Sequence, residues 1–420
     1  MYKRFERSIA SGKKLARLFS LGDLYVSDFL VKHQSPKSPP IEHALAFDKE
    51  SKLAQLTAQA DAELMWGDSY WYRSGTNQFM SDALYDVALK TISCVKYSDE
   101  DVYLDIASND GTLLSHVKNI APNLKRMGID PSMFADAMDK ADVSIKDYFS
   151  KAAFRSSSLG HKKAKFISCC AMFYDLQNPI AFLKDVHEVL AEDGIFTLQL
   201  SYSPLMVIQN DISNICSEHI AYYTLASLKY VLSKAKFKIM DAELNNVNGG
   251  SIRLYCVKKA FDANLFKTQA DRDIAIIRVS SLEGWESKKS VNTVDFYKSF
   301  YKEALLQKGK LLKFLKHQKK ENKTVWGYGA STKGNTFLQW AEIAQYITKI
   351  ADRQERKLGL FTVGTNIEVC SEEEMRKAQP DYLFIFPWHF ISEFKEREKE
   401  YLNKGGKFIV TSPRFEIIEG

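Results

Sequence analysis

LDIASNDGTLL, residues 104–114, carries the clearest fold signal in the sequence. Its apolar start predicts a buried strand and its polar middle predicts a turn. A helix is expected from Gly111, because Leu113, Leu114 and Val117 recur at helical spacing. A strand that runs through a short turn into a helix is the unit of an open α/β sheet, and such sheets bind ligands at the carboxyl ends of their strands. The stretch therefore predicts an α/β fold with a ligand site at this turn.

The flanking sequence repeats the alternation of strand and helix. One helix is expected from about Asn77, which can cap it, and another from Asn178, where Pro179 occupies the first turn without losing a needed hydrogen bond. Further strands are expected at RMGID (126–130), AKFISCC (164–170) and IFTLQLS (195–201). Strands separated by helices predict a mostly parallel sheet that is covered on both faces.

A second unit of the same kind is expected near the C-terminus. A long helix over 294–317 precedes strands at TVWGYG (324–329), YITKIAD (346–352), DYLFIFP (381–387) and KFIVTSP (407–413). Residues 1–75 show no clean period, and KHQSPKSPP (32–40) predicts a loop. We therefore expect a small N-terminal domain over 1–75, an α/β domain over 76–260 and a second doubly wound α/β domain over 261–420.

The composition narrows the class of protein. The chain has 420 residues, and its net charge of +6 arises from 58 basic and 52 acidic residues that are interspersed, so nucleic-acid binding is not expected. No apolar run suits a signal peptide or a membrane span. None of the six cysteines forms a CxxC pair, which fits free thiols in a reducing compartment. A cytoplasmic monomer or homodimer is expected.

Two acidic residues around the first turn favour a nucleoside ligand. Asp105 lies at the end of the first strand, and Asp130 ends the second strand, where a carboxylate can accept ribose hydroxyls. A dinucleotide site would need glycines close to a pyrophosphate, but Ala107 occupies the place of the first glycine and only Gly111 remains. S-adenosylmethionine (SAM) carries no phosphate, and Asp105, Asn109 and backbone amides can bind its methionine end. The turn therefore favours SAM over NAD, although the same residues also suit an ordinary turn.

Six ordered motifs carry a resemblance that spans nearly the whole chain. The sequence resembles the SAM-dependent C-methyltransferases that act on nucleotide-linked 4-keto-hexoses. This resemblance implies a class I methyltransferase Rossmann-like domain over 76–260, a nucleotide-sugar-binding Rossmann-like domain over 261–420 and a substrate-side domain over 1–75. The motifs are GDSYWYRSGTN (67–77), LDIASNDGTLL (104–114), CCAMFYDLQNP (169–179), NICSEHIAYYTL (214–225), NVNGGSIRLY (246–255) and WGYGASTKGNT (326–336).

The sequence departs from that family at two places. The family has a zinc-binding cysteine cluster near its N-terminus, but here no cysteine precedes Cys94, and residues such as Asp48 and Ser51 stand at the matching places. A structural zinc needs four Cys or His ligands, which His33 and His43 alone cannot provide, so we expect no metal. The family's tyrosine two positions before Glu218 is replaced by Cys216.

The resemblance implies methylation of the carbon next to the sugar ketone, at carbon 3, and the chemistry needs a base. A ketone can delocalise the charge left when a neighbouring C–H loses its proton, and neutral histidine is suited to take that proton. We predict His219 as the base, Glu218 as the residue that orients it, and Tyr72 as donor to the developing enolate oxygen. The alternatives are a capping glutamate, a packed histidine and a core tyrosine.

Five further residues complete the predicted site. Arg73 and Lys333 suit phosphate groups of a nucleotide-sugar, Asn248 and Tyr222 suit the sugar, and Asp147 is a further cofactor-binding acid. The NGG turn after Val247 is equally well explained by a need for positive φ. Other functions that we considered are sugar O-methylation, NAD-dependent oxidation and binding of a nucleotide-sugar without catalysis.

Overall fold

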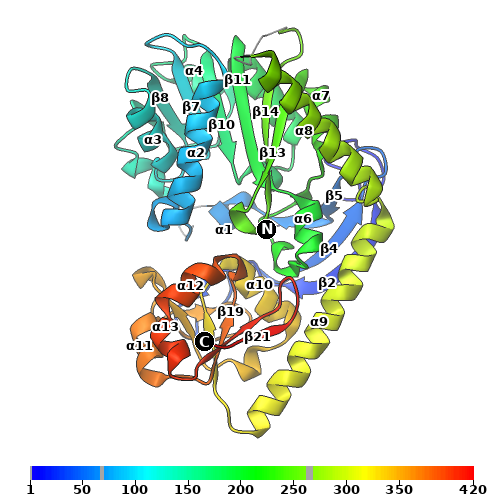
Figure 1. Cartoon of the computed structure of the whole chain (residues 1–420), viewed down its shortest axis with the longest axis vertical. Helices are drawn as coiled ribbons and strands as arrows, with labels where there is room; N and C mark the ends of the chain where they lie inside the picture. Colours follow the sequence, from blue (N-terminus) through cyan, green and yellow to red (C-terminus); the bar gives the residue numbers. More distant parts are fainter. Residues whose placement is uncertain (1, 67–70, 262–267) are drawn as a thin grey trace.

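The computed structural model describes residues 2–66, 71–261 and 268–420. The start of the GDSYWYRSGTN motif, with Tyr70, lies outside the described residues. Two α/β units lie one above the other in Figure 1, and the N-terminal strands lie between them on the side of the long helix α9 (Val294–Lys320). The predicted α/β class is confirmed.

The first unit is built on a seven-stranded sheet with the order β13-β14-β11-β10-β7-β8-β9. Strands β7 to β11 are parallel and β14 is antiparallel to both of its neighbours. The chain leaves β7 in one direction and returns to its other side at β10, so a ligand crevice is expected where these two strands end. The strands are β7 (Val102–Ile106), β8 (Lys125–Ile129), β9 (Val143–Ile145), β10 (Ala164–Cys170), β11 (Leu190–Ser201), β13 (Phe237–Asn245) and β14 (Ser251–Lys258).

Helices cover both faces of this sheet, as predicted. Leu104 of β7 packs into one apolar cluster and Tyr103 into another on the opposite face. The helix caps also follow the prediction, because the Asn77 side chain accepts from the backbone N–H of Met80 and Asn178 caps the helix that begins at Pro179. The helices are α2 (Gln78–Cys94), α3 (Thr112–Ile120), α4 (Lys151–Ser156), α5 (Pro179–Val189), α6 (Ser203–Ile208) and α7 (Leu225–Lys234).

The N-terminal segment forms an antiparallel sheet that the sequence did not reveal. Its order is β12-β5-β4-β2, and the short strand β12 (Ala221–Tyr222) comes from the first α/β unit. Strand β4 (Ile41–Phe47) is largely buried on both faces, so its sequence lacks the alternation that marks a half-exposed strand. The remaining N-terminal elements are β1 (Tyr2–Arg4), β2 (Ala16–Leu24), β3 (Phe29–Leu30), β5 (Ala54–Leu56), β6 (Ala58–Ala60) and α1 (Ala62–Trp66).

A hydrogen-bonded carboxylate joins two loops of the N-terminal sheet. Asp48 is 1% exposed and accepts from the Ser11 hydroxyl at 2.6 Å, from the Ser51 hydroxyl and from the backbone N–H of Glu50 at 2.9 Å. Burial alone would raise the pKa of Asp48, but hydrogen bonds from Ser11, Ser51 and Ser8 outweigh it and hold the pKa below its usual value. We call Asp48 and the three serines Ser8, Ser11 and Ser51 the Asp48 latch.

The metal content of the native protein tests the prediction that no structural zinc is bound. Elemental analysis after dialysis against a chelator should find well under one zinc per chain, because no group of three or more potential ligands gathers in the described part of the chain. Unfolding by urea should give the same midpoint with and without the chelator. A stoichiometric zinc that survives dialysis would contradict the prediction.

The second α/β unit contains a six-stranded sheet with the order β18-β16-β15-β19-β20-β21. All its neighbouring pairs are parallel except β20 with β21, and the connection reverses direction between β15 and β19. This sheet therefore has its own ligand crevice. Its strands are β15 (Val325–Tyr328), β16 (Ile350–Asp352), β18 (Val369–Ser371), β19 (Tyr382–Ile385), β20 (Lys407–Val410) and β21 (Glu416–Ile418).

Two long helices connect the units, α8 (Gln269–Lys288) and α9, and four shorter ones belong to the second sheet. In the described ranges, no helix combines the length and apolarity that crossing a membrane requires. The division of the chain at residues 75 and 260 stays a proposal. The shorter helices are α10 (Thr332–Ala341), α11 (Glu372–Ala378), α12 (Ile391–Arg397) and α13 (Lys399–Asn403).

Candidate active site

A cavity of about 320 Å³ opens where β7, β8 and β10 end. We call it the first cavity. Its lining includes the predicted cofactor residues Asp105, Ala107, Asn109 and Asp130, and also Glu218 and His219. The sheet's crevice thus brings together residues that are far apart in the sequence.

The turn after β7 has an unusual backbone. Ala107, Asn109 and Gly111 all have positive φ values, of 57°, 52° and 75°. The backbone N–H of Ala107 donates to the carbonyl of Ile129 at 2.8 Å, which ties the turn to the end of β8. At Gly111 an added Cβ would lie 3.0 Å from Cγ of Met138, so both the conformation and the space favour glycine there. Gly111 is the residue before α3, as predicted, and does not line the cavity itself.

Asp130 holds the cofactor turn in place. Its Oδ2 accepts from the backbone N–H of Asn109 at 2.8 Å, and its Oδ1 accepts from the backbone N–H of Ser132 at 2.8 Å. Asp105 lies 3% exposed beside it and accepts from the Ser168 hydroxyl at 2.6 Å. Burial, together with the charge of Asp130, raises the pKa of Asp105 to about 7.

Two of the predicted cofactor residues have other partners. The side-chain amide of Asn109 accepts from the backbone N–H of Ser74 and donates to the backbone carbonyl of Tyr72. It therefore holds the segment that contains these two residues against the turn after β7. Asp147 is exposed, lies outside the cavity lining and accepts from the backbone N–H of Tyr148. The structure therefore gives no support to a cofactor contact by Asp147.

The predicted base, His219, also lines the first cavity. Nδ1 of His219 lies 3.1 Å from the carbonyl oxygen of Asn214, so Nδ1 carries the proton and Nε2 is the acceptor. Burial, and then the nearby charge of Lys333, lowers the pKa of His219 to about 3. The neighbouring residue Glu218 is 8% exposed, and burial raises the pKa of its carboxyl. His219 is therefore neutral over the physiological range.

The predicted tyrosines are placed differently from each other. Tyr72 lines the first cavity, and the protein around its hydroxyl raises its pKa to about 12, so it is a hydrogen-bond donor at neutral pH. Tyr222 is 4% exposed, does not line the cavity and donates to the carbonyl of Asn214 at 3.3 Å. A sugar contact by Tyr222 is therefore not supported, because its hydroxyl is already used to shape the turn before β12.

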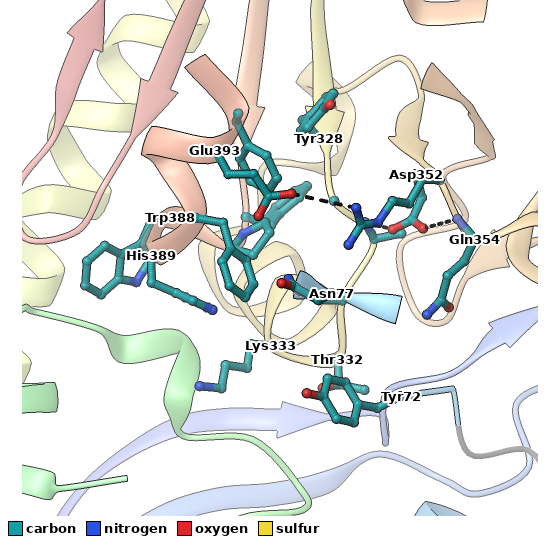
Figure 2. Close-up of a pocket in the computed structure, with 18 of the residues that line it drawn as sticks. Tyr72, Asn77, Tyr328, Thr332, Lys333, Asp352, Gln354, Trp388, His389 and Glu393 are labelled. Atoms are coloured by element: carbon teal, nitrogen blue, oxygen red, sulfur yellow. Dashed lines mark hydrogen bonds and ion pairs between the residues drawn. The ribbon is translucent and has the colours of Figure 1, made fainter. Parts of the chain in front are cut away.

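A second cavity, of about 240 Å³, lies at the crevice of the C-terminal sheet. Figure 2 shows Asp352 at its wall, with Trp388 and His389 across from it. Oδ2 of Asp352 accepts from the backbone N–H of Ala330 at 2.7 Å, and Oδ1 accepts from the backbone N–H of Gln354 at 2.8 Å. Asp130 makes the same two kinds of bond in the first unit, to the turn after the first strand and to the residue two positions on.

The two cavities are contiguous. Tyr72, Met80, Asn248, Thr332 and Lys333 line both of them. Lys333 lies in the first turn of α10, near His219 and His389. Burial lowers the pKa of both imidazoles, and the charge of Lys333 lowers it further. A ligand with a nucleoside at one end and a sugar at the other can therefore extend from one cavity into the other past Lys333.

Two other predicted substrate residues lie at this junction. Asn248 has a φ of 53° in the turn before β14, so the positive-φ explanation of the NGG turn is confirmed, and its side chain faces both cavities. Arg73 lines the second cavity but also pairs with Asp110 at 3.1 Å.

Sequence reasoning missed Asp175, Asp352 and the Trp388–His389 pair. Asp352 had a usable signal, because IAD ends the second strand of its sheet just as GID ends the second strand of the first. Asp175 ends a short 3-10 turn, Phe173–Asp175, and nothing in its own stretch of sequence shows that the fold brings it to the cavity that Glu218 also lines.

Comparison with known proteins finds two matching family models and a similar C-methyltransferase. The model of a methyltransferase domain matches residues 72–242, and the model of the C-methyltransferase C-terminal domain matches residues 246–413. The chain is 25% identical over 324 residues to C-methyltransferase NovU of Streptomyces niveus. The aligned region covers 76% of this chain and 74% of that protein.

Among solved structures, a SAM-dependent methyltransferase from Clostridium acetobutylicum covers 42% of this chain and 90% of its own, with 15% identity and a TM-score of 0.31. The plantazolicin methyltransferase BpumL, in complex with S-adenosylhomocysteine, covers 42% of this chain and 83% of its own, with 15% identity and a TM-score of 0.33. The two family models match successive parts of the sequence, so the chain combines a methyltransferase domain with a C-methyltransferase C-terminal domain and is a SAM-dependent methyltransferase.

Proposed function

We propose that the protein methylates a carbon next to the ketone of a nucleotide-linked 4-keto-sugar, at carbon 3. The observation that carries this proposal is the contiguity of the two cavities, with Tyr72, Asn248 and Lys333 in the walls of both. A nucleotide-sugar is long enough to need two joined sites, and only its sugar end has to reach the methyl donor.

The residues of the first cavity fit SAM. The crevice at the ends of β7 and β10 offers the ionisable carboxyls Asp105 and Asp130 for an ammonium group and for ribose hydroxyls. The turn contains Ala107, which suits a donor without phosphates. SAM supplies an electrophilic methyl group when bound.

The second cavity suits the nucleotide. Asp352 is held as Asp130 is, and it is placed to accept a sugar hydroxyl of a nucleoside. Lys333, near the junction, suits the diphosphate, and Trp388 offers an aromatic face to a base. The keto-sugar then lies in the first cavity beside Tyr72, which donates to the ketone oxygen, and beside Glu218 and His219.

Incubation of the protein with SAM and a panel of nucleotide-linked 4-keto-hexoses tests the proposal. Mass spectrometry should detect transfer of one methyl group, and NMR of a product made with ¹³C-labelled donor should show a new carbon–carbon bond at carbon 3. A methyl group on oxygen would instead establish sugar O-methylation. Methyl transfer to no member of the panel would overturn the proposed substrate class.

SAM binding should depend on pH through Asp105. The pKa of this carboxyl is raised to about 7, so at about pH 6 it is mostly protonated and has to lose its proton before it can pair with the donor's ammonium group. We expect SAM affinity to rise about tenfold between about pH 6 and pH 7.5 by calorimetry. Asp105→Asn should abolish the dependence. A wild-type affinity that is constant over this range would contradict the assignment.

A further inference from the structure

Two acidic residues, Asp175 and Glu218, line the first cavity together with the turn after β7. One side-chain amide links the backbones of these two residues, because Nε2 of Gln59 donates to the backbone carbonyl of Asp175 and to that of Glu218, at 3.1 Å each. Gln59 is 1% exposed and belongs to β6, which pairs with β1, so a buried side chain of the N-terminal segment ties the backbones of the two acidic residues together.

Neither carboxyl is fully satisfied within the protein. Oδ1 of Asp175 and Oε2 of Glu218 are buried from solvent and have no hydrogen-bond partner among the described residues. Buried carboxyl oxygens without a partner are costly, and they persist at sites where a ligand or a proton completes them. These two oxygens lie in residues that line the space where the proposed function places the sugar.

Burial shifts the pKa values of the two carboxyls and of the His219 imidazole in opposite directions. Burial disfavours the charged form, so it raises the pKa of Asp175, helped by the charge of Glu218, and it raises the pKa of Glu218. Burial and Lys333 together lower the pKa of His219 to about 3. Substrate binding excludes more water and strengthens both effects, so the carboxylates become stronger bases and the imidazole becomes a weaker one.

We propose that Asp175 is a further catalytic residue, which forms with Glu218 a single proton acceptor that removes the hydrogen next to the sugar ketone. The pair carries one proton and one negative charge in the resting enzyme, since two adjacent buried carboxylates cannot both be ionised. His219 then serves as a neutral hydrogen-bond acceptor through Nε2, with its ring fixed by Asn214 and packed against Tyr174. This inference rests on the proposed function.

The step balances within the site. The C–H bond next to the ketone breaks, its proton forms an O–H bond with the ionised carboxylate of the pair, and the electron pair moves into the enolate, whose oxygen accepts from Tyr72. The pair enters the step with one proton and leaves it with two, and the second proton passes to water when the product leaves. Lys333 lies near Glu218 and favours its ionised form before the step.

Hydrogen exchange isolates this step from methyl transfer. The protein, S-adenosylhomocysteine and the nucleotide 4-keto-hexose that is methylated best are incubated in heavy water, and incorporation of deuterium next to the ketone is followed by NMR. Asp175→Asn and Glu218→Gln should each slow exchange by about a hundredfold or more, the usual effect of losing a general base. Asp175→Glu should recover part of the rate, and His219→Gln should stay within about tenfold of the wild type.

An infrared measurement tests the shared proton without any substrate. The wild type at neutral pH should show the carbonyl band of a protonated carboxyl that is lost in Asp175→Asn. Asp99→Asn, in an exposed turn, serves as the matched control and should leave both the band and the exchange rate unchanged. Calorimetry with SAM should give the same affinity for all these variants, which separates loss of the base from loss of the fold.

The outcomes separate the inference from the proposed function. An enzyme that methylates the keto-sugar, but whose Asp175→Asn variant exchanges hydrogen at the wild-type rate, would overturn the role of Asp175 alone. Loss of exchange in His219→Gln with retention in Asp175→Asn would return the base to His219. A wild type that neither exchanges nor methylates any member of the panel would overturn the proposed function and this inference together.

Discussion

Replacement of Glu286 by alanine should lower the free energy of unfolding by about 3–5 kcal/mol, the largest stability effect that we expect from one substitution. Glu286 lies on α8 and is 2% exposed. One of its oxygens accepts from the Tyr202 hydroxyl and from the backbone N–H of Leu225, and the other accepts from the backbone N–H of Ala226. The substitution leaves these buried donors without partners.

The same carboxylate also lies at the N-terminus of α7, where a negative charge is favourable. Loss of Glu286 therefore loosens the start of the helix that follows β12 and the turn of Glu218. Urea unfolding followed by circular dichroism measures the effect. Glu283→Ala, one turn earlier on α8, is the matched control, because its surface ion pair with Lys229 should contribute less than about 1 kcal/mol. Equal midpoints for the two variants would contradict the assignment.

Replacement of Lys333 by methionine should weaken nucleotide binding by about 1.5–3 kcal/mol, which corresponds to roughly a tenfold to hundredfold rise in Kd. Lys333 lines both cavities at the start of α10, where the helix N-terminus also favours an anion. Methionine keeps most of the length of the side chain and removes its charge. The effect should therefore fall on the diphosphate and leave the affinity for SAM nearly unchanged.

Calorimetry with uridine, thymidine and guanosine diphosphates measures this effect without the keto-sugar. Lys310→Met, on the exposed side of α9, is the control for a general loss of positive charge. Salt should weaken binding to the wild type more than binding to Lys333→Met, because the variant lacks the charge that salt screens. Nucleotide binding to Lys333→Met with wild-type affinity would place the diphosphate elsewhere.

Much of the fold could be predicted because local signals agreed with the final structure. The strand, turn and helix around Gly111 and the capped helix at Pro179 carry their pattern in a few consecutive residues. Strand β4 could not be predicted in this way, since burial on both faces removes the alternation that identifies a strand. The sheet that contains it is completed by β12, which lies far along the chain.

The candidate site was predictable only where a motif kept its residues together. Asp105, Asp130 and the Glu218–His219 pair lie in such motifs and reach the first cavity. Asn109 was predicted to contact the cofactor, but the partners of its side chain could not be predicted, because Tyr72 and Ser74 come from a segment that the tertiary fold brings over the turn. The position of Asp175 could not be predicted for the same reason, because only the tertiary fold, through Gln59, brings it close to Glu218.

The Asp48 latch determines which chemical stresses the N-terminal sheet can resist. Hydroxyl and carboxylate groups are not targets of peroxide, whereas a cluster of metal-binding thiolates would be oxidised and would release its ion. Growth in metal-poor medium should likewise leave the folding yield unaffected. The vulnerability is to acid instead: because the pKa of Asp48 is lowered by folding, the stability that it contributes is present above its unfolded pKa and is lost as the pH falls through the folded value.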